Sequence, residues 1–218
     1  MAHIQKIGVF DSGLGGMSVA RSIQKELPNY DVIFVNDKQN MPYGDKDSGQ
    51  LLILVLPIIK KLVDEGCAVI IIACNTVTTT IIKELRTMIN VPIIGIEPMI
   101  KVAAKHTKSK IIAVCATPAT LNSKRYLWLK KTYAKDLLVI EPDCSNWAYM
   151  IESNNLNKYD IHDTINTICD QGADIIVLGC THYHWIETQI RSIASKRAIT
   201  IQPEQPVLRE LKKILSIT

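Results

Sequence analysis

Two cysteines close two similar segments of the chain, one in each half. Segment 66–74 reads GCAVIIIAC and ends at Cys74, and segment 172–180 reads GADIIVLGC and ends at Cys180. In both, a glycine precedes an aliphatic run typical of a strand buried on both faces, and polar residues follow the cysteine. A thiol at such a strand end, beside a helix N-terminus, is a candidate acid or base. We therefore expect two functional thiols at equivalent positions.

The halves of the chain show a second internal similarity. Segment 7–12, IGVFDS, aligns with segment 112–117, IAVCAT, because each is a short apolar run that leads into a polar loop. Lobes related by a pseudo-twofold axis would hold the two cysteines on opposite sides of one ligand. Opposed thiols suit chemistry on both faces of a single atom.

Strands and helices alternate along the whole chain, which predicts an α/β fold with mainly parallel sheets flanked by helices. Ser48 and Thr120 are the expected N-caps of two helices. We expect two pseudosymmetric lobes, with the active site between them. The first lobe would hold residues 1–98 plus about 200–218, and the second residues 99–199. Strands are expected near 6–10, 32–35, 69–73, 92–96, 111–115, 137–140, 175–179 and 198–201, and helices over 17–27, 48–65 and 207–215 and after Thr76, Pro98, Ala119, His162 and His184.

Composition narrows the class of protein. The 218 residues are 47% hydrophobic, enough for a substantial core. No apolar run approaches the roughly 18 residues of a membrane span, and the N-terminus lacks the pattern of a signal peptide. We therefore expect a cytoplasmic protein without a membrane partner, whose six cysteines stay reduced. The net charge of +4 comes from scattered Lys and Arg, so no nucleic-acid partner is expected.

A glycine-rich turn follows the first predicted strand. Segment 10–16, FDSGLGG, can present backbone N–H groups to an anion. Its glycine spacing is not that of a dinucleotide-binding turn, and no Walker lysine follows. A tight turn is the alternative interpretation. Asp11, at the strand end, is a candidate base or partner of a thiol.

The sequence Cys180-Thr-His182-Tyr-His184 admits a zinc site as an alternative. A strand end that continues into a helix would scatter these side chains, and no further ligand motif completes a site. The favoured interpretation is that His182 tunes Cys180 or relays its proton, whereas His184 is expected at the surface. The other four cysteines are expected to act as small core hydrophobes; they are Cys67, Cys115, Cys144 and Cys169.

These motifs together resemble the glutamate racemases of the aspartate/glutamate racemase superfamily. The resemblance covers residues 7 to about 190, and His182 stands where related aspartate racemases typically carry glutamate. It is carried by Asp11-Ser-Gly-Leu-Gly-Gly16, Pro42-Tyr-Gly44, Ala73-Cys-Asn-Thr76, Glu97-Pro98, Ala116-Thr117 with Thr120, and Leu178-Gly-Cys-Thr-His-Tyr183.

The resemblance implies a cofactor-independent, metal-free isomerase that interconverts L- and D-glutamate for peptidoglycan synthesis, and thus for cell-wall biogenesis and cell shape. It also implies a homodimer. Cys74 and Cys180 would be the two acid/base residues, assisted by Asp11 and His182. Asp37 and Glu152 would support them from behind the site. The implied substrate-binding residues are Asp11, Ser12, Tyr43, Gly44, Asn75, Thr76, Thr117, Thr120, Thr181 and His182.

The chain departs from the family pattern in ways that leave the proposed catalytic groups in place. His184 stands where a proline is usual, and Thr78 to Thr80 replace small residues. The sequence ends at Thr218, whereas most members continue into a further tail that packs on the first lobe. We therefore expect the shorter end to affect lobe closure, stability and activity. Alternative functions remain open: a racemase of aspartate or another amino acid, a non-catalytic amino-acid-binding protein of the same fold, or a zinc hydrolase.

Overall fold

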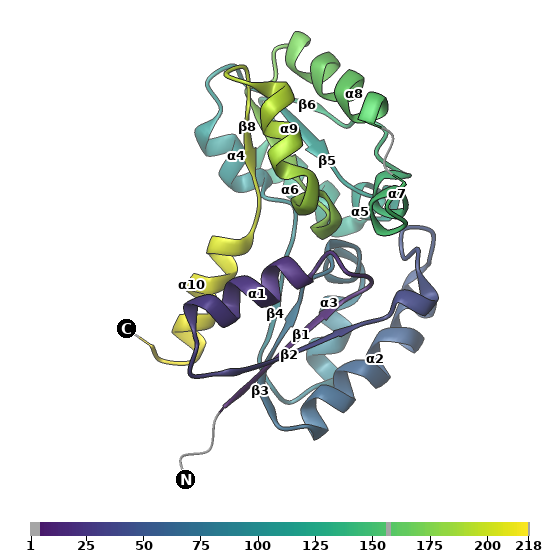
Figure 1. Cartoon of the computed structure of the whole chain (residues 1–218), viewed down its shortest axis with the longest axis vertical. Helices are drawn as coiled ribbons and strands as arrows, with labels where there is room; N and C mark the ends of the chain where they lie inside the picture. The colour runs from purple at the N-terminus through teal and green to yellow at the C-terminus, as the bar shows by residue number, and fades with distance from the viewer. Residues whose placement is uncertain (1–4, 156–157, 218) are drawn as a thin grey trace.

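Two four-stranded parallel sheets form the centres of two lobes in the computed structural model, which describes residues 5–155 and 158–217 (Figure 1). Both sheets have the same strand order, β2-β1-β3-β4 and β6-β5-β7-β8. The α/β fold and the internal duplication are therefore confirmed. The strands are β1 Lys6–Asp11, β2 Asp31–Asn36, β3 Cys67–Ile72, β4 Ile93–Gly95, β5 Ile111–Cys115, β6 Leu138–Ile140, β7 Ile175–Leu178 and β8 Ile199–Ile201.

Strand register brings the ends of the central strands together in each lobe. In the first sheet, Phe10 of β1 pairs with Ile72 of β3. In the second, Cys115 of β5 pairs with Leu178 of β7. Because the strands are parallel, the loops that follow them leave from one edge of the sheet, where ligands bind in open α/β folds. Asp11 is the last residue of β1, and Cys74 and Cys180 lie just after β3 and β7.

The duplication extends to backbone conformation. Gly66 and Gly172 precede the equivalent strands β3 and β7, with φ of +87° and +88°. Residues with a side chain rarely adopt this left-handed region, whereas glycine does so without steric cost. A glycine in the same conformation therefore leads into each of the strands that precede Cys74 and Cys180.

Helices cover both faces of each sheet, and their apolar sides explain their positions. In the first lobe, α2 and α3 pack on one face, and α1 and α10 on the other. In the second lobe, α8 and α9 lie on one face, and α4 and α6 on the other. The helical segments are α1 Met17–Glu26, η1 Lys38–Asn40, α2 Ser48–Asp64, α3 Asn75–Met88, α4 Ile100–His106, α5 Pro118–Asn122, α6 Lys124–Tyr133, α7 Trp147–Glu152, α8 Lys158–Asp170, η2 Thr181–Ile186, α9 Glu187–Ala194 and α10 Glu204–Ile214.

The predicted helix caps were wrong. Ser48 is the first helical residue of α2, and the cap is Asp47, whose carboxylate accepts the Gln50 N–H at 2.8 Å. Thr120 lies inside α5, and the cap is Thr117. In both cases a hydroxyl that follows the true cap satisfied the sequence pattern equally well.

The last helix returns to the first lobe after β8 has completed the second sheet (Figure 1). Val207, Leu208 and Leu211 of α10 are buried against α1 and the first sheet. Full burial of each such side chain contributes about 1.5–3 kcal/mol. The lobe boundaries near residues 98 and 200 stay a prediction. None of the helices within residues 5–155 and 158–217 is long and apolar enough to span a membrane.

Candidate active site

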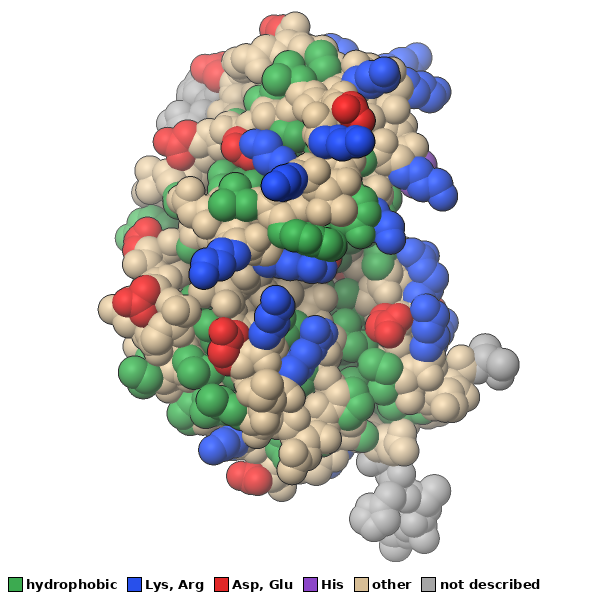
Figure 2. Space-filling model, turned by 180° about the vertical axis from the view of Figure 1, so that it is seen from behind, with side chains coloured by type: hydrophobic (Ala, Val, Ile, Leu, Met, Phe, Trp, Pro, Cys, Tyr) green, Lys and Arg blue, Asp and Glu red, His purple; other side chains and the backbone are tan. Residues whose placement is uncertain are grey.

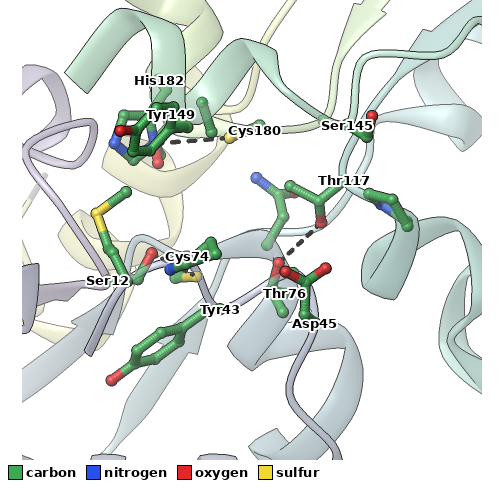
Figure 3. Close-up of a pocket in the computed structure, with 18 of the residues that line it drawn as sticks. Ser12, Tyr43, Asp45, Cys74, Thr76, Thr117, Ser145, Tyr149, Cys180 and His182 are labelled. Carbon is green, nitrogen blue, oxygen red and sulfur yellow. Dashed lines mark hydrogen bonds between the residues drawn. The ribbon is translucent and has the colours of Figure 1, made fainter. Parts of the chain in front are cut away.

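A cavity of about 200 Å³ lies between the two lobes (Figure 3). It is smaller than the roughly 300–1,000 Å³ of pockets for drug-sized ligands, so it suits a small molecule. Both lobes line it, and among its described lining residues there is no Lys or Arg. The lining residues are Ser12, Met41, Pro42, Tyr43, Gly44, Asp45, Cys74, Asn75, Thr76, Thr117, Pro118, Ser145, Asn146, Ala148, Tyr149, Gly179, Cys180, Thr181 and His182.

Cys74 enters the cavity from the first lobe, at the N-cap position of α3. Its Sγ lies 3.5 Å from Ser12 Oγ. Burial raises the pKa of the Cys74 thiol to about 12, with a further contribution from the negative charge of Asp11. The thiol is therefore neutral at pH 7, and its thiolate would be a strong base.

Cys180 enters the same cavity from the second lobe, at the N-cap position of η2. Its Sγ lies 3.7 Å from His182 Nδ1. Burial raises the pKa of the Cys180 thiol well above its usual range, opposed by the backbone N–H of His182. In Figure 3, Cys180 and Cys74 project from opposite sides of the cavity.

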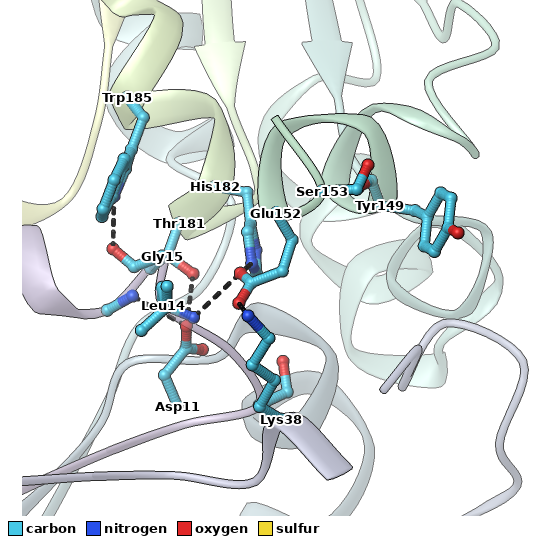
Figure 4. A network of polar contacts seen from close by, with 12 residues as sticks. Asp11, Leu14, Gly15, Lys38, Tyr149, Glu152, Ser153, Thr181, His182 and Trp185 are labelled. Carbon is cyan, nitrogen blue, oxygen red and sulfur yellow. Dashed lines mark hydrogen bonds and ion pairs between the residues drawn. The ribbon is translucent and has the colours of Figure 1, made fainter. Parts of the chain in front are cut away.

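Glu152 links His182 to the first lobe (Figure 4). Its Oε2 lies 2.7 Å from His182 Nε2 and accepts the Leu14 N–H at 3.0 Å, and its Oε1 pairs with Lys38 at 3.4 Å. Burial raises the pKa of Glu152, but these hydrogen bonds outweigh it, and the pKa is lowered. Because an ionised carboxylate only accepts hydrogen bonds, Nε2 of His182 carries a proton. In the neutral ring, Nδ1 then offers its lone pair to Cys180.

Asp11 lies buried behind the cavity, where the lobes meet. Its Oδ2 accepts the Gly16 N–H at 2.7 Å and the hydroxyl of Thr181, from the other lobe, at 3.2 Å. Its Oδ1 is buried without a partner among the described residues. Burial raises the pKa of Asp11 from 3.8 to about 6, although the nearby His182 lowers it.

Three threonine hydroxyls form a cluster across the lobes. Thr76 Oγ1 lies 3.0 Å from Thr117 Oγ1 and 3.4 Å from Thr120 Oγ1, and Thr117 and Thr120 are 3.1 Å apart. Beside them, both side-chain polar atoms of Asn75 are buried without a partner in the part of the chain that the structure describes. Unpaired buried amides are costly, so this group is set up to bind a polar ligand.

Tyr43 lines the cavity with its backbone and not with its hydroxyl. Its ring points away from the cavity in Figure 3, and its hydroxyl donates to Asp37 at 2.5 Å. Asp37 also accepts from the amide of Asn40 at 2.8 Å. Asp37 therefore anchors the loop that carries Tyr43 and Gly44.

The structure brings the residues predicted from the sequence together in one place. Most of them line the cavity, while Asp11, Thr120, Asp37 and Glu152 lie behind it. Four further polar residues line the cavity that no sequence pattern predicted, all on loops or on a short helix. They are Asp45, Ser145, Asn146 and Tyr149.

The expectation that His184 lies at the surface was wrong. Its Nε2 is buried without a partner among the described residues, and its Nδ1 lies 3.4 Å from Ser18 Oγ in the first lobe. Burial lowers the pKa of His184 to about 4, so the ring is neutral at pH 7. The other four cysteines are buried, as expected; they are Cys67, Cys115, Cys144 and Cys169.

The alternative zinc interpretation requires a cluster of ligands. Cys180 and His182 face each other, whereas the Nδ1 of His184 points to Ser18. Across residues 5–155 and 158–217, no three His, Cys, Asp or Glu side chains are grouped so that they could hold a metal ion.

Comparisons with known proteins agree with the fold and identify the family. The family model for Asp/Glu/Hydantoin racemase matches residues 14–203. The glutamate racemase of Bifidobacterium adolescentis is 36% identical over 222 aligned positions, which cover 99% of this chain and 86% of that protein.

Solved structures show the same architecture. The glutamate racemase of Escherichia coli, in complex with L-glutamate and the activator UDP-MurNAc-Ala, superposes with a TM-score of 0.85, over 98% of this chain and 83% of that one, at 24% identity. The Francisella tularensis glutamate racemase, in complex with D-glutamate, gives a TM-score of 0.80 at 28% identity, over 97% and 81% of the two chains. The chain therefore belongs to the Asp/Glu/Hydantoin racemase family of isomerases, among its glutamate racemases.

Proposed function

We propose that this protein interconverts L- and D-glutamate by a two-thiol mechanism that needs no cofactor. The observation that carries the proposal is the arrangement of Cys74 and Cys180, which enter one small cavity from opposite lobes. Inversion at Cα requires removal of a proton from one face and delivery of a proton to the other. Two opposed acid/base groups do this without turning the substrate over.

The thiols exchange roles in each turnover. One cysteine, as thiolate, removes the Cα proton and becomes a thiol, while the other, as thiol, donates its proton to the opposite face and becomes a thiolate. The protein then holds the mirror-related protonation state, ready for the other enantiomer. The raised pKa of Cys74, about 12, makes its thiolate a strong base. A substrate ammonium group in the cavity would favour that thiolate.

Different groups assist the two thiols. Ser12 and Asp11 lie beside Cys74, and the His182–Glu152 pair lies beside Cys180. The imidazole can accept the Cys180 proton through Nδ1, and the ionised Glu152 stabilises the imidazolium that results. Asp11 contributes negative charge for a substrate ammonium group.

The cavity binds carboxylates through neutral donors. The N-terminus of α3 presents Asn75 and Thr76, and the hydroxyls of Thr117 and Thr120 complete a cluster suited to one carboxylate. We assign the remaining polar contacts to substrate binding as well: Ser12, Thr181, His182 and the backbone at Tyr43 and Gly44. In a small cavity between the lobes, these oriented dipoles stabilise the carbanion-like transition state.

We infer from the family resemblance that the D-glutamate serves peptidoglycan synthesis, that the protein acts in the cytoplasm, and that it forms a homodimer. Depletion of the protein in its host would then produce cells whose growth is rescued by added D-glutamate. Sedimentation velocity would report the dimer.

The test follows the circular dichroism of pure L-glutamate incubated with metal-free, cofactor-free protein. Decay of the signal to zero supports the proposal. A matched sample of L-aspartate tests the substrate, and racemisation of aspartate alone would move the proposal to that substrate. Wild-type turnover in Cys74→Ser would overturn the two-thiol mechanism. Binding of glutamate by calorimetry without Cα proton exchange would indicate a binding protein instead.

A further inference from the structure

The second lobe carries a strongly basic segment. Residues 99–135 contain nine of the 25 Lys and Arg residues of the chain and no Asp or Glu, so that all 21 acidic residues lie elsewhere. The remainder of the chain therefore has a net negative charge. Along the sequence, these cations form small scattered groups separated by apolar residues.

The fold gathers the cations onto one face. Helices α4 and α6 pack side by side on the outer face of the second sheet. Lys101 and Lys105 of α4 and Lys124 and Lys131 of α6 are exposed. Within residues 5–155 and 158–217, no carboxylate forms an ion pair with any of these four lysines. Figure 2, which views the molecule from behind, shows blue side chains spread around green ones over this lobe.

Two large apolar side chains stand among the cations. Leu127 and Trp128 of α6 are 52% and 46% exposed. Trp128 packs edge-on against Tyr133, with ring centroids 5.8 Å apart. A cation covers each ring, since Arg125 lies 4.6 Å from the Trp128 ring centroid and Lys101 lies 5.4 Å from that of Tyr133. The rings are thus held in place, with a face of each already covered.

We propose that this α4/α6 face, defined by Lys101, Lys105, Lys124, Leu127, Trp128 and Lys131, binds the surface of an anionic lipid bilayer. Clustered lysines near a helix surface are attracted to anionic headgroups. Exposed Leu and Trp side chains are suited to the boundary between headgroups and acyl chains. Nucleic acid is the less suitable partner, because Arg125 and Lys101 each occupy one ring face and so leave less aromatic surface for base stacking.

The test is cosedimentation of the full-length protein with vesicles of phosphatidylcholine alone or mixed with phosphatidylglycerol. Binding is expected only to the mixed vesicles, and it should weaken as salt is added. The double variant Lys124→Gln/Lys131→Gln should bind about 30-fold more weakly, from the contribution of two lysines near the membrane surface. The matched control is Lys60→Gln/Lys61→Gln on α2 of the first lobe, which removes the same charge and should bind as wild type.

Tryptophan fluorescence tests the orientation. The chain has three tryptophans, and the emission of wild type should shift to the blue on mixed vesicles. Trp128→Phe should abolish the shift, and Trp185→Phe should keep it. Three results would overturn the proposal: no binding to mixed vesicles, equal losses in the two lysine variants, or binding to a single-stranded oligonucleotide without binding to vesicles. The last would assign the face to nucleic acid.

Discussion

The two thiol sites have the same backbone arrangement, but the side chains around the two thiols differ. The strands, the preceding glycines and the N-cap positions of Cys74 and Cys180 are equivalent. Yet Cys74 lies beside a hydroxyl and near a buried aspartate, whereas Cys180 faces an imidazole held by a carboxylate. The repeat explains why two thiols oppose each other, and the differing partners show that the two halves of the site are chemically unequal.

The largest expected effect comes from removing either thiol. Cys74→Ala and Cys180→Ala should each lower kcat/KM for glutamate by about 10³-fold or more, the upper range of acid/base contributions. In D₂O, each variant keeps one base and should exchange the Cα proton of one enantiomer only, and the enantiomer should differ between the variants. Proton NMR of each enantiomer measures this.

The control for the thiol variants is Cys169→Ala, which alters a buried cysteine of the second lobe away from the cavity. It should retain exchange of both enantiomers. If Cys74→Ala and Cys180→Ala exchanged the same enantiomer, the assignment of one thiol to each face would be wrong.

The difference between the sites predicts a smaller effect for Glu152→Gln. A neutral amide cannot stabilise a charged His182, so kcat should fall about 10- to 100-fold, while KM changes little. The pH dependence of kcat should change as well. Steady-state kinetics across pH measures both, with the exposed Glu84→Gln as control. An unchanged kcat would show that His182 acts without its carboxylate.

The raised pKa of Asp11 predicts that the stability of wild type and of Asp11→Asn will depend differently on pH. Its pKa is raised from 3.8 to about 6 in the folded chain, so the folded state holds this proton more tightly than the unfolded state. This stabilisation of the folded state is fully present below pH 3.8 and is lost as the pH rises through 6. The free energy of unfolding should therefore fall by about 3 kcal/mol over this pH range. Asp11→Asn should lack this change.

Urea unfolding of wild type and Asp11→Asn across that pH range measures the difference. Exposed Asp64→Asn serves as the reference for a surface carboxylate. Parallel pH profiles of wild type and Asp11→Asn would contradict a buried, proton-binding Asp11.

The smallest effect concerns the mouth of the cavity, where the lobes differ in charge. The first lobe contributes Asp45, and the second contributes the neutral Ser145 and Asn146. The negative charge of Asp45 repels an anionic substrate in a solvent-exposed position, so Asp45→Asn should lower KM for glutamate about two- to threefold. The effect should vanish at high salt, and exposed Asp136→Asn should show none.

The sequence was sufficient to predict the sheets because buried parallel strands are nearly continuous apolar runs. All eight strands were expected close to their observed positions. The sequence 147–152, WAYMIE, is too short to show a helical period, and so α7 was missed. The sequence predicted one helix after Ala119, but the structure has two, α5 and α6. They are divided at Ser123, which is the N-cap of α6.

The site was predictable where chemistry follows strand ends, as at Asp11, Cys74 and Cys180. It was not predictable where a loop of the first lobe meets a short helix of the second, as at Asp45 and Tyr149, because their proximity depends on lobe packing that no local pattern records. His184 shows the same limit: its polar type indicated the surface, whereas the residue is half-buried, with Nδ1 beside Ser18 of α1 and Nε2 buried.

The return of α10 to the first lobe determines which of the two lobes completes its core first during synthesis. The second sheet has all its strands once β8 has left the ribosome. The first sheet still exposes an apolar face at that moment, and it is covered only when Val207, Leu208 and Leu211 follow. Because this contact joins residues far apart in sequence, it forms late. The lobe that is translated first is thus the last to complete its core.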